Sequence, residues 1–227
     1  GNIQVSGTRT YANGSKLVFN GSAAQFTGDG FPSASSVNVE IDNSNGVTMT
    51  DDLTINTNRT LTLTSGDLNI GTNTLTLAGA VSGSGEINAG ENSNVTIAGT
   101  GSFGTFQVGT DTIGILRINR TSSGSVTLGR DLTVRDTLDM QNGIFVIDGR
   151  TITIDGPYKG GSGDFSTDLS TIIRVRNIGE ISGTFALESN DQLGLLSVAR
   201  EGETVDFRAT ATIDSLVLID GSVTSTS

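Results

Sequence analysis

The chain has 227 residues and a formal charge of −11, and it contains no Cys, His or Trp. It therefore cannot form a thiolate nucleophile, a disulfide, a His/Cys zinc site or a catalytic triad. The excess of 24 acidic over 13 basic residues disfavours binding to nucleic acid or to anionic lipid. Gly, Ser, Thr and Asn make up 105 residues, so turn formers and small polar side chains dominate the sequence.

Short alternations of apolar residues with Thr, Asn, Asp or Ser recur along the chain and break at Gly or Asn-Gly. This period of two predicts half-buried strands, and no stretch has the spacing of an amphipathic helix. No apolar run is long enough for a transmembrane helix. The predicted strands are 37–42, 46–50, 53–56, 60–64, 67–70, 74–78, 94–98, 104–108, 115–119, 125–128, 131–135, 137–140, 144–147, 151–155, 172–176, 184–188, 195–199, 204–208, 210–213 and 215–219.

A sequence repeat with a period of 79 residues joins the blocks that begin at Val47, Val126 and Val205. Its copies span approximately 16–87, 94–169 and 172–227, and the last copy is truncated. The chain begins Gly1-Asn2-Ile3 without Met or a leader, so we expect a processed or excised segment. An all-β repeat without linkers predicts one continuous parallel β-solenoid over 1–227, with three coils of about 26 residues or four of about 20 in each repeat.

The alternative fold is a string of small antiparallel, immunoglobulin-like sandwiches, because Asn-Gly pairs such as Asn142-Gly143 suit hairpin turns. Solenoid corners use the same residues, and the lack of Trp argues against sandwich cores. A hairpin at Asn142-Gly143 would exclude the solenoid. The solenoid, of either hand, predicts these inward side chains: Val47, Leu53, Ile55, Leu61, Leu63, Leu75, Leu77, Leu128, Leu132, Val134, Leu138, Ile152, Ile154, Leu196, Val198, Phe207 and Ile213.

The phrases Leu53-Thr54-Ile55-Asn56 and Leu61-Thr62-Leu63-Thr64, which continues in the same rhythm to Leu77, carry a family resemblance. They resemble the β-solenoid repeats of large bacterial secreted and cell-surface proteins of the adhesin or filamentous-haemagglutinin type. The resemblance covers most of residues 16–155 and implies an extracellular stalk, fibre or adhesive module. Surface glycans are then a second class of partner, and the sequence names no glycan.

Paired acids are the candidates for catalysis, because β-helical polysaccharide-degrading enzymes work with carboxylates in a groove. The pairs are Asp51 with Asp52, Asp131 with Asp136 and Asp139, and Asp164 with Asp168. No long insertion that could build a cleft interrupts the rhythm, so we expect a structural or adhesive protein and no enzyme. A carbohydrate-binding module or a polysaccharide-degrading enzyme is the alternative function.

Calcium and ice are two further ligands to consider. Gly160-Gly161-Ser162-Gly163-Asp164 approaches a calcium-binding repeat, which makes Asp164 and Asp168 calcium candidates. The motif occurs once, so we interpret it as a flexible glycine-rich connection and expect no bound metal or cofactor. Thr-x-Thr pairs resemble ice-binding faces, but the 79-residue repeat does not keep them in register, and β propensity explains them.

The two ends are predicted to be assembly surfaces. Strand-like residues occupy both ends, with Ile3 and Val5 at one and Leu216 and Leu218 at the other, and no amphipathic helix covers them. An open solenoid end leaves an apolar stack and strand edges uncovered. We therefore expect the chain to be continued at both ends by further repeats of a longer chain or by identical subunits stacked end to end.

Overall fold

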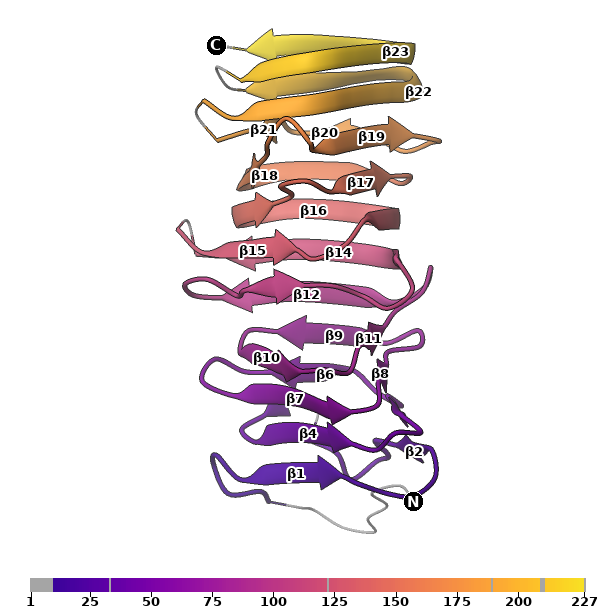
Figure 1. Cartoon of the computed structure of the whole chain (residues 1–227), viewed down its shortest axis with the longest axis vertical. Helices are drawn as coiled ribbons and strands as arrows, with labels where there is room; N and C mark the ends of the chain where they lie inside the picture. The colour runs from indigo at the N-terminus through magenta and orange to yellow at the C-terminus, as the bar shows by residue number, and fades with distance from the viewer. Residues whose placement is uncertain (1–9, 33, 122, 189, 209–210, 227) are drawn as a thin grey trace.

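The computed structural model describes residues 10–32, 34–121, 123–188, 190–208 and 211–226. The chain winds into about ten stacked coils of about 21 residues each, with the N-terminal coil at one end of the rod and the C-terminal coil at the other (Figure 1). Every strand pair runs parallel and joins neighbouring coils, as in Leu75↔Val95 and Val95↔Leu116. The described residues include no long apolar helix of the kind that crosses a membrane.

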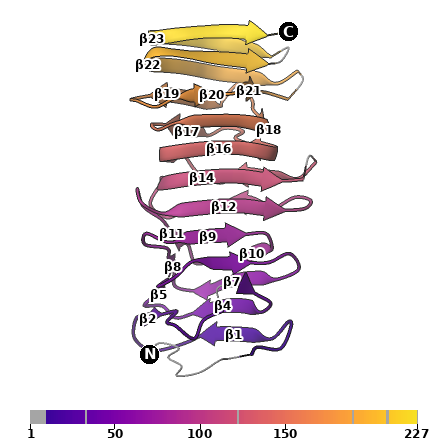
Figure 2. The same cartoon turned by 180° about the vertical axis from the view of Figure 1, so that it is seen from behind.

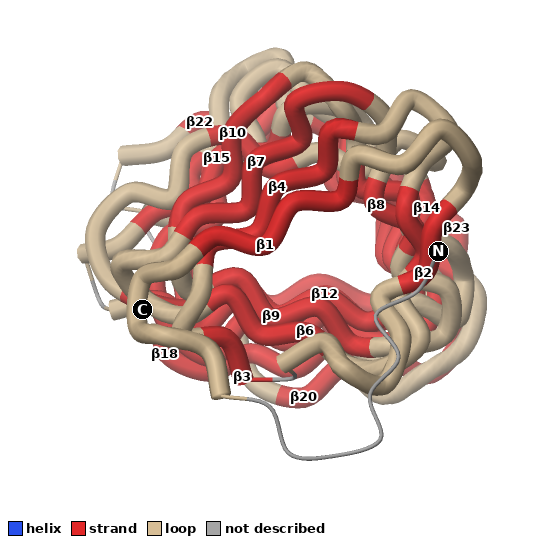
Figure 3. The backbone as a smooth tube through the Cα atoms, turned by 90° about the horizontal axis from the view of Figure 1, so that it is seen from below, coloured by secondary structure: helices blue, strands red, loops and turns tan. Residues whose placement is uncertain are grey.

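Three sheets form the walls of the N-terminal coils, and the third sheet alone forms the walls after β11 (Ile87–Asn88). Viewed along the axis, the first sheet faces β6 (Leu53–Ile55), β9 (Thr74–Leu77) and β12 (Asn94–Gly99) of the third, and the second closes one side (Figure 3). The first sheet contains β1 (Lys16–Phe19), β4 (Asn38–Asp42), β7 (Thr60–Ser65) and β10 (Ala80–Gly83). The second contains β2 (Gln25–Phe26), β5 (Val47–Thr48), β8 (Leu68–Asn69) and β11 (Ile87–Asn88).

The third sheet runs the length of the rod and is seen from behind in Figure 2. Its main path contains β3 (Ala34–Ser35), β6 (Leu53–Ile55), β9 (Thr74–Leu77), β12 (Asn94–Gly99), β14 (Thr112–Arg120), β16 (Leu132–Val146), β17 (Thr151–Ile154), β19 (Ile172–Arg176), β22 (Gln192–Arg208) and β21 (Phe185–Ala186). Strands β13 (Thr105–Phe106), β15 (Ser125–Leu128), β18 (Tyr158–Ser166), β20 (Ile181–Ser182) and β23 (Thr212–Thr226) pair alongside this path.

The core is a set of inward columns that the alternation of each strand creates. In β9, Leu75 and Leu77 are buried while Thr74 and Thr76 face outward, and the same pattern repeats in β12. On the outer face of the sheet, Thr54, Thr76 and Thr96 form a short column, and the next residue in that column is Arg117. Each sheet therefore buries one face against the interior of the coil.

Buried Asn and Ser side chains bind main-chain groups at the corners between sheets. The Asn43 amide donates to Ala23 O of the coil below at 2.8 Å, and its oxygen accepts from Asn45 N at 2.9 Å. The Ser93 hydroxyl donates to Gly71 O at 2.6 Å. Main-chain groups at a corner lack ladder partners, so these short polar side chains satisfy them.

The parallel solenoid is confirmed and the sandwich is excluded. Asn142 and Gly143 lie inside β16 and pair in parallel with Ser162 and Gly163 of β18, so no hairpin forms there. The predicted inward residues are buried except Ile213, which is half-buried because it belongs to the last coil.

Two expectations from the sequence are wrong. The glycine-rich segment at 160–163 is not a flexible connection but part of β18, where Gly161 and Gly163 pass close to Met140 O. Phe31 lies between Asp29-Gly30 and Pro32 in the sequence, a context that predicts exposure, but it is half-buried and packs against Phe19 with ring centroids 5.7 Å apart. Both segments lack an alternating pattern, so the sequence carries little signal for them.

The coil sets the spatial repeat of the molecule. One inward column runs from Leu75 to Tyr158 and crosses four coils in 83 residues. Of the two predicted numbers of coils in each 79-residue repeat, four is therefore closer than three. The sequence repeat does not keep register with the coils. Val47 lies in the second sheet, whereas Val126 lies in the third. Corresponding residues of the repeat copies therefore both lie in strands, but in different sheets.

Candidate functional site

The last coil leaves one long strand edge uncovered. β23 pairs with β22 in parallel from Gln192↔Thr212 to Arg208↔Thr226. Its opposite edge has no partner strand in the described part of the chain. An edge of this length presents a row of main-chain donors and acceptors that can pair with another strand.

The apolar stack is also open at this end. Leu216 and Leu218 continue the inward columns of Leu196 and Val198. Leu196 and Val198 are 0% exposed, whereas Leu216 and Leu218 are 48% and 50% exposed because no coil follows. With Val217 and Ile219, which are also exposed, they form a run of large apolar side chains (Leu216, Val217, Leu218 and Ile219) that we call the β23 end.

The N-terminal end has a different character. Two aromatic side chains pack against the core beside the first coil: the Tyr11 hydroxyl donates to Gly30 O at 2.6 Å, and Phe31 lies on Phe19. The predicted assembly residues Ile3 and Val5 lie outside the described residues. Residues 211–226 contain no aromatic side chain.

The two calcium candidates are not brought together into a site. Asp164 lies within β18, paired with Ile144, whereas Asp168 lies in the following turn. The Asp168 carboxylate accepts hydrogen bonds from Gly149 N at 3.0 Å and Ser170 N at 2.8 Å, so it holds turns together. Among the described residues, no group of three or more acidic side chains could hold a metal ion.

Three of the acids considered for catalysis bind neighbouring coils, whereas Asp51 and Asp136 accept from the adjacent Thr50 and Thr137. Asp139 accepts from Arg117 Nε at 2.8 Å, and Asp131 accepts from Thr151 N at 2.9 Å. Asp52 accepts from Thr74 N at 2.7 Å. Each partner lies about one coil away, so these carboxylates contribute to the stacking of the rod.

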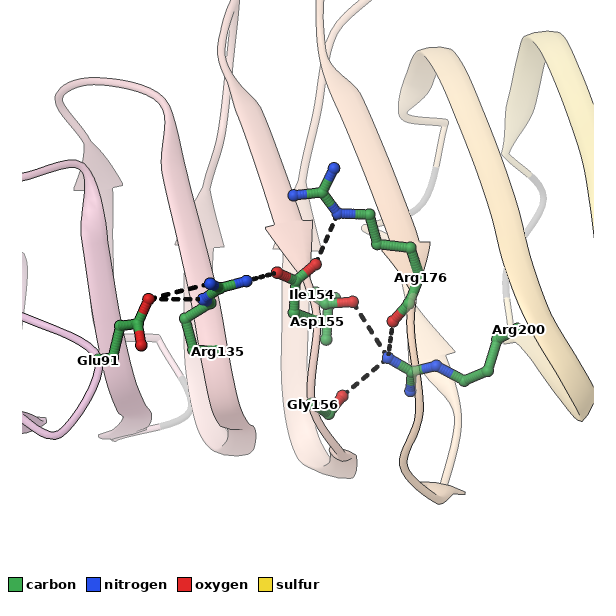
Figure 4. A network of polar contacts seen from close by, with 7 residues as sticks. All are labelled: Glu91, Arg135, Ile154, Asp155, Gly156, Arg176 and Arg200. Carbon is green, nitrogen blue, oxygen red and sulfur yellow. Dashed lines mark hydrogen bonds and ion pairs between the residues drawn. The ribbon is translucent and has the colours of Figure 1, made fainter.

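A chain of ion pairs crosses several coils and joins the exposed Glu91, Arg135 and Arg176 to the buried Asp155 (Figure 4). Glu91 contacts Arg135 at 2.9 Å, and Arg135 contacts Asp155 at 2.8 Å. Arg176 contacts the other Asp155 oxygen at 2.6 Å. The hydrogen bonds with Asp155 and Glu91 raise the pKa of Arg135. The sequence did not predict this network, because its partners are separated by one or two coil lengths and the coil length was not fixed.

Beneath this network, the Arg200 side chain is buried and binds four main-chain carbonyls. Its Nη2 donates to Arg176 O at 2.8 Å, Gly156 O at 2.9 Å and Ile154 O at 3.0 Å, as Figure 4 shows. Its Nη1 donates to Gly179 O at 3.1 Å. A guanidinium suits this role because it offers five N–H donors in a fixed plane.

Arg120, which is also buried, makes similar contacts. It donates to the carbonyls of Ala98, Thr100 and Gly101 of the coil below and lies over the Phe103 ring. Burial lowers the pKa of both Arg120 and Arg200. Both side chains join coils through main-chain contacts, which the sequence did not indicate.

Comparison with known proteins adds no relative: no protein-family model, curated protein or solved structure matches the chain. The fold and the β23 end thus define a parallel β-solenoid with an uncovered terminal coil. The geometry of the rod, and not a relative, is the basis for a functional proposal.

Proposed function

We propose that the chain is a structural protein of the extracellular surface, either a segment of a repetitive stalk or a subunit of a fibre, and not an enzyme. The resemblance of residues 53–77 to the repeats of bacterial adhesins supports this class. The observation that carries the proposal is the β23 end, where Leu216 and Leu218 stand half exposed beside an unpaired strand edge. Such an end is completed by one further parallel coil.

In the isolated chain, the occupant of the β23 end is the N-terminal coil of a second copy. Charge favours this arrangement. Residues 1–40 contain Arg9 and Lys16 against Asp29 and Glu40, with Lys16 Nζ 2.6 Å from the Glu40 carboxylate, whereas residues 201–227 contain five acids against Arg208. Pairing two β23 ends would bring two acidic coils together, while head-to-tail stacking places the acidic end against one without net charge. A heterologous contact of this kind extends into a filament.

Sedimentation velocity over a wide concentration range tests the proposal. We expect the wild-type chain to form elongated particles whose mass rises with concentration, and a Leu216→Lys/Leu218→Lys variant to stay monomeric. Leu169→Lys is the matched control, because Leu169 is 55% exposed on a turn away from the end. Wild-type protein that stays monomeric throughout, or an end variant that assembles like wild type, would contradict the proposal.

A further inference from the structure

The first sheet is interrupted in the middle of the rod. β10 pairs with β7, and β13, which begins the next coil on that side, pairs with β15. In the described part of the chain, no hydrogen bond joins β10 to β13. Both strands therefore have an edge that faces the other without pairing, although neither lies at an end of the molecule.

The hydrogen-bond directions show which main-chain groups face the interruption. Ala80 N and Ser84 N donate to β7 and its flank, and main-chain groups alternate in direction along a strand, so those of Val81 and Gly83 point away from β7. On the other wall, the carbonyls of Gly104 and Phe106 accept from the coil of β15, which directs the main chain of Thr105 toward β10.

A groove of about 210 Å³ occupies this interruption. Its walls include the main chain of β10 and the half-buried side chains of Val81 and Phe103, with the buried Leu63, Ile87 and Phe106 beneath. Glu86 is the one charged residue among those that line it, and its carboxylate lies 3.4 Å from Arg130 Nη2. The groove thus combines free strand edges, an apolar floor and one carboxylate that also contacts Arg130.

We propose that this groove binds an extended peptide segment of a partner protein by strand addition. The peptide main chain pairs with Val81 and Gly83 on one wall and with Thr105 on the other. One apolar side chain of the peptide enters between Val81 and Phe103, and an adjacent Lys or Arg lies beside Glu86. Main-chain pairing supplies affinity in this mode of recognition, and the side-chain pocket supplies specificity. The negative charge of the whole chain favours the approach of a basic segment.

The test uses the full chain and the labelled peptide acetyl-Lys-Val-Thr-Leu-Thr-Lys-amide, with fluorescence anisotropy as the readout. We expect saturable binding, and binding roughly tenfold weaker when the two central peptide nitrogens are methylated, because methylation removes the donors that strand addition needs. Replacing both peptide Lys by Glu, or Glu86→Gln in the protein, is also expected to weaken binding. Hydrogen exchange is expected to show new protection at the Val81, Gly83 and Thr105 amides.

The open edge of β23 is a competing site for any extended peptide, so the location of binding is decisive. The Leu216→Lys/Leu218→Lys variant is expected to keep full peptide affinity. Absence of saturable binding, equal affinity for the methylated peptide, or protection confined to residues 212–226 would overturn the proposal. Its outcome is independent of whether the rod assembles end to end.

Discussion

At the residue scale, buried polar side chains hold successive coils together. Arg200 and Arg120 bind carbonyls of neighbouring coils, and Asn43 and Ser93 do so at other corners. The ladders of a solenoid satisfy strand main chains but not the corners, where the direction of the chain changes. These side chains supply the missing partners, so the stability of the rod depends on them as well as on its apolar columns.

The first prediction concerns the buried guanidinium. Arg200→Met removes the donor of four hydrogen bonds to main-chain carbonyls, so we expect it to lower the free energy of unfolding by roughly 2–4 kcal/mol. Arg150→Met is the control, because the exposed Arg150 should change stability by less than about 0.5 kcal/mol. Urea unfolding followed by circular dichroism measures both variants. Equal urea midpoints for the two variants would contradict the claim that Arg200 stabilises the stack of coils.

The second prediction uses two aspartates at one corner with opposite pKa shifts. Burial, and then the charges of Asp168 and Asp191, raises the pKa of Asp148. Burial also acts on Asp168, but hydrogen bonds from Gly149, Thr171 and Ser170 prevail and lower its pKa. Ionised Asp148 therefore opposes folding, whereas ionised Asp168 favours it.

At neutral pH, Asp148→Asn is expected to raise the melting temperature and Asp168→Asn to lower it. The gain of Asp148→Asn shrinks as the pH falls through the raised pKa, because the wild-type carboxyl is then protonated in the fold. The loss of Asp168→Asn shrinks as the pH falls through its lowered folded-state pKa, at more acidic pH. Melting curves from neutral to acid pH measure both effects, and shifts of the same sign would refute the assignment.

At the element scale, close contact between coils demands glycine at particular corners. Gly66 follows β7 with φ at 79°, and a Cβ there would lie 1.8 Å from Asn43 O of the coil below. At Gly90, in contrast, an added Cβ would have no atom within 4 Å. The corner after β7 therefore combines a left-handed conformation with a contact that only glycine permits.

The third prediction follows from this contrast. Gly66→Ala should destabilise the fold by more than about 2 kcal/mol, because it adds conformational strain to a main-chain clash. Gly90→Ala should stay within about 0.5 kcal/mol of wild type. Differential scanning calorimetry compares the two variants. A Gly66→Ala variant with the melting temperature of the wild type would contradict the claim that this corner permits only glycine.

Strands that alternate clearly could be predicted from the sequence, and those without alternation could not. Residues 74–78 and 94–98 correspond to β9 and β12. The ranges 131–135, 137–140 and 144–147 merge into β16, because one strand bends around a corner and keeps its pairing. β10 and β18 were missed, since Gly and small residues remove the period-two signal.

At the scale of the whole molecule, the sequence predicted a solenoid with Leu216 and Leu218 at one end but not the contacts between coils. The partners Glu91 and Arg135 are two coils apart, and Arg135 and Asp155 are one coil apart. Such pairs become visible only when the coil length is known, and the 79-residue repeat does not keep register with the coil. The missing pairing between β10 and β13 could not be predicted for the same reason, because it depends on which segments of successive coils lie side by side.

Hydrogen exchange of the β23 amides at increasing protein concentration tests the central claim most directly. If the β23 end accepts a further coil, the edge amides of residues 212–226 exchange fast in dilute solution and become protected as concentration rises. Leu216→Lys/Leu218→Lys abolishes that protection, and Leu169→Lys does not. Edge amides that are already protected in dilute monomers, or that stay unprotected at every concentration, would contradict the account.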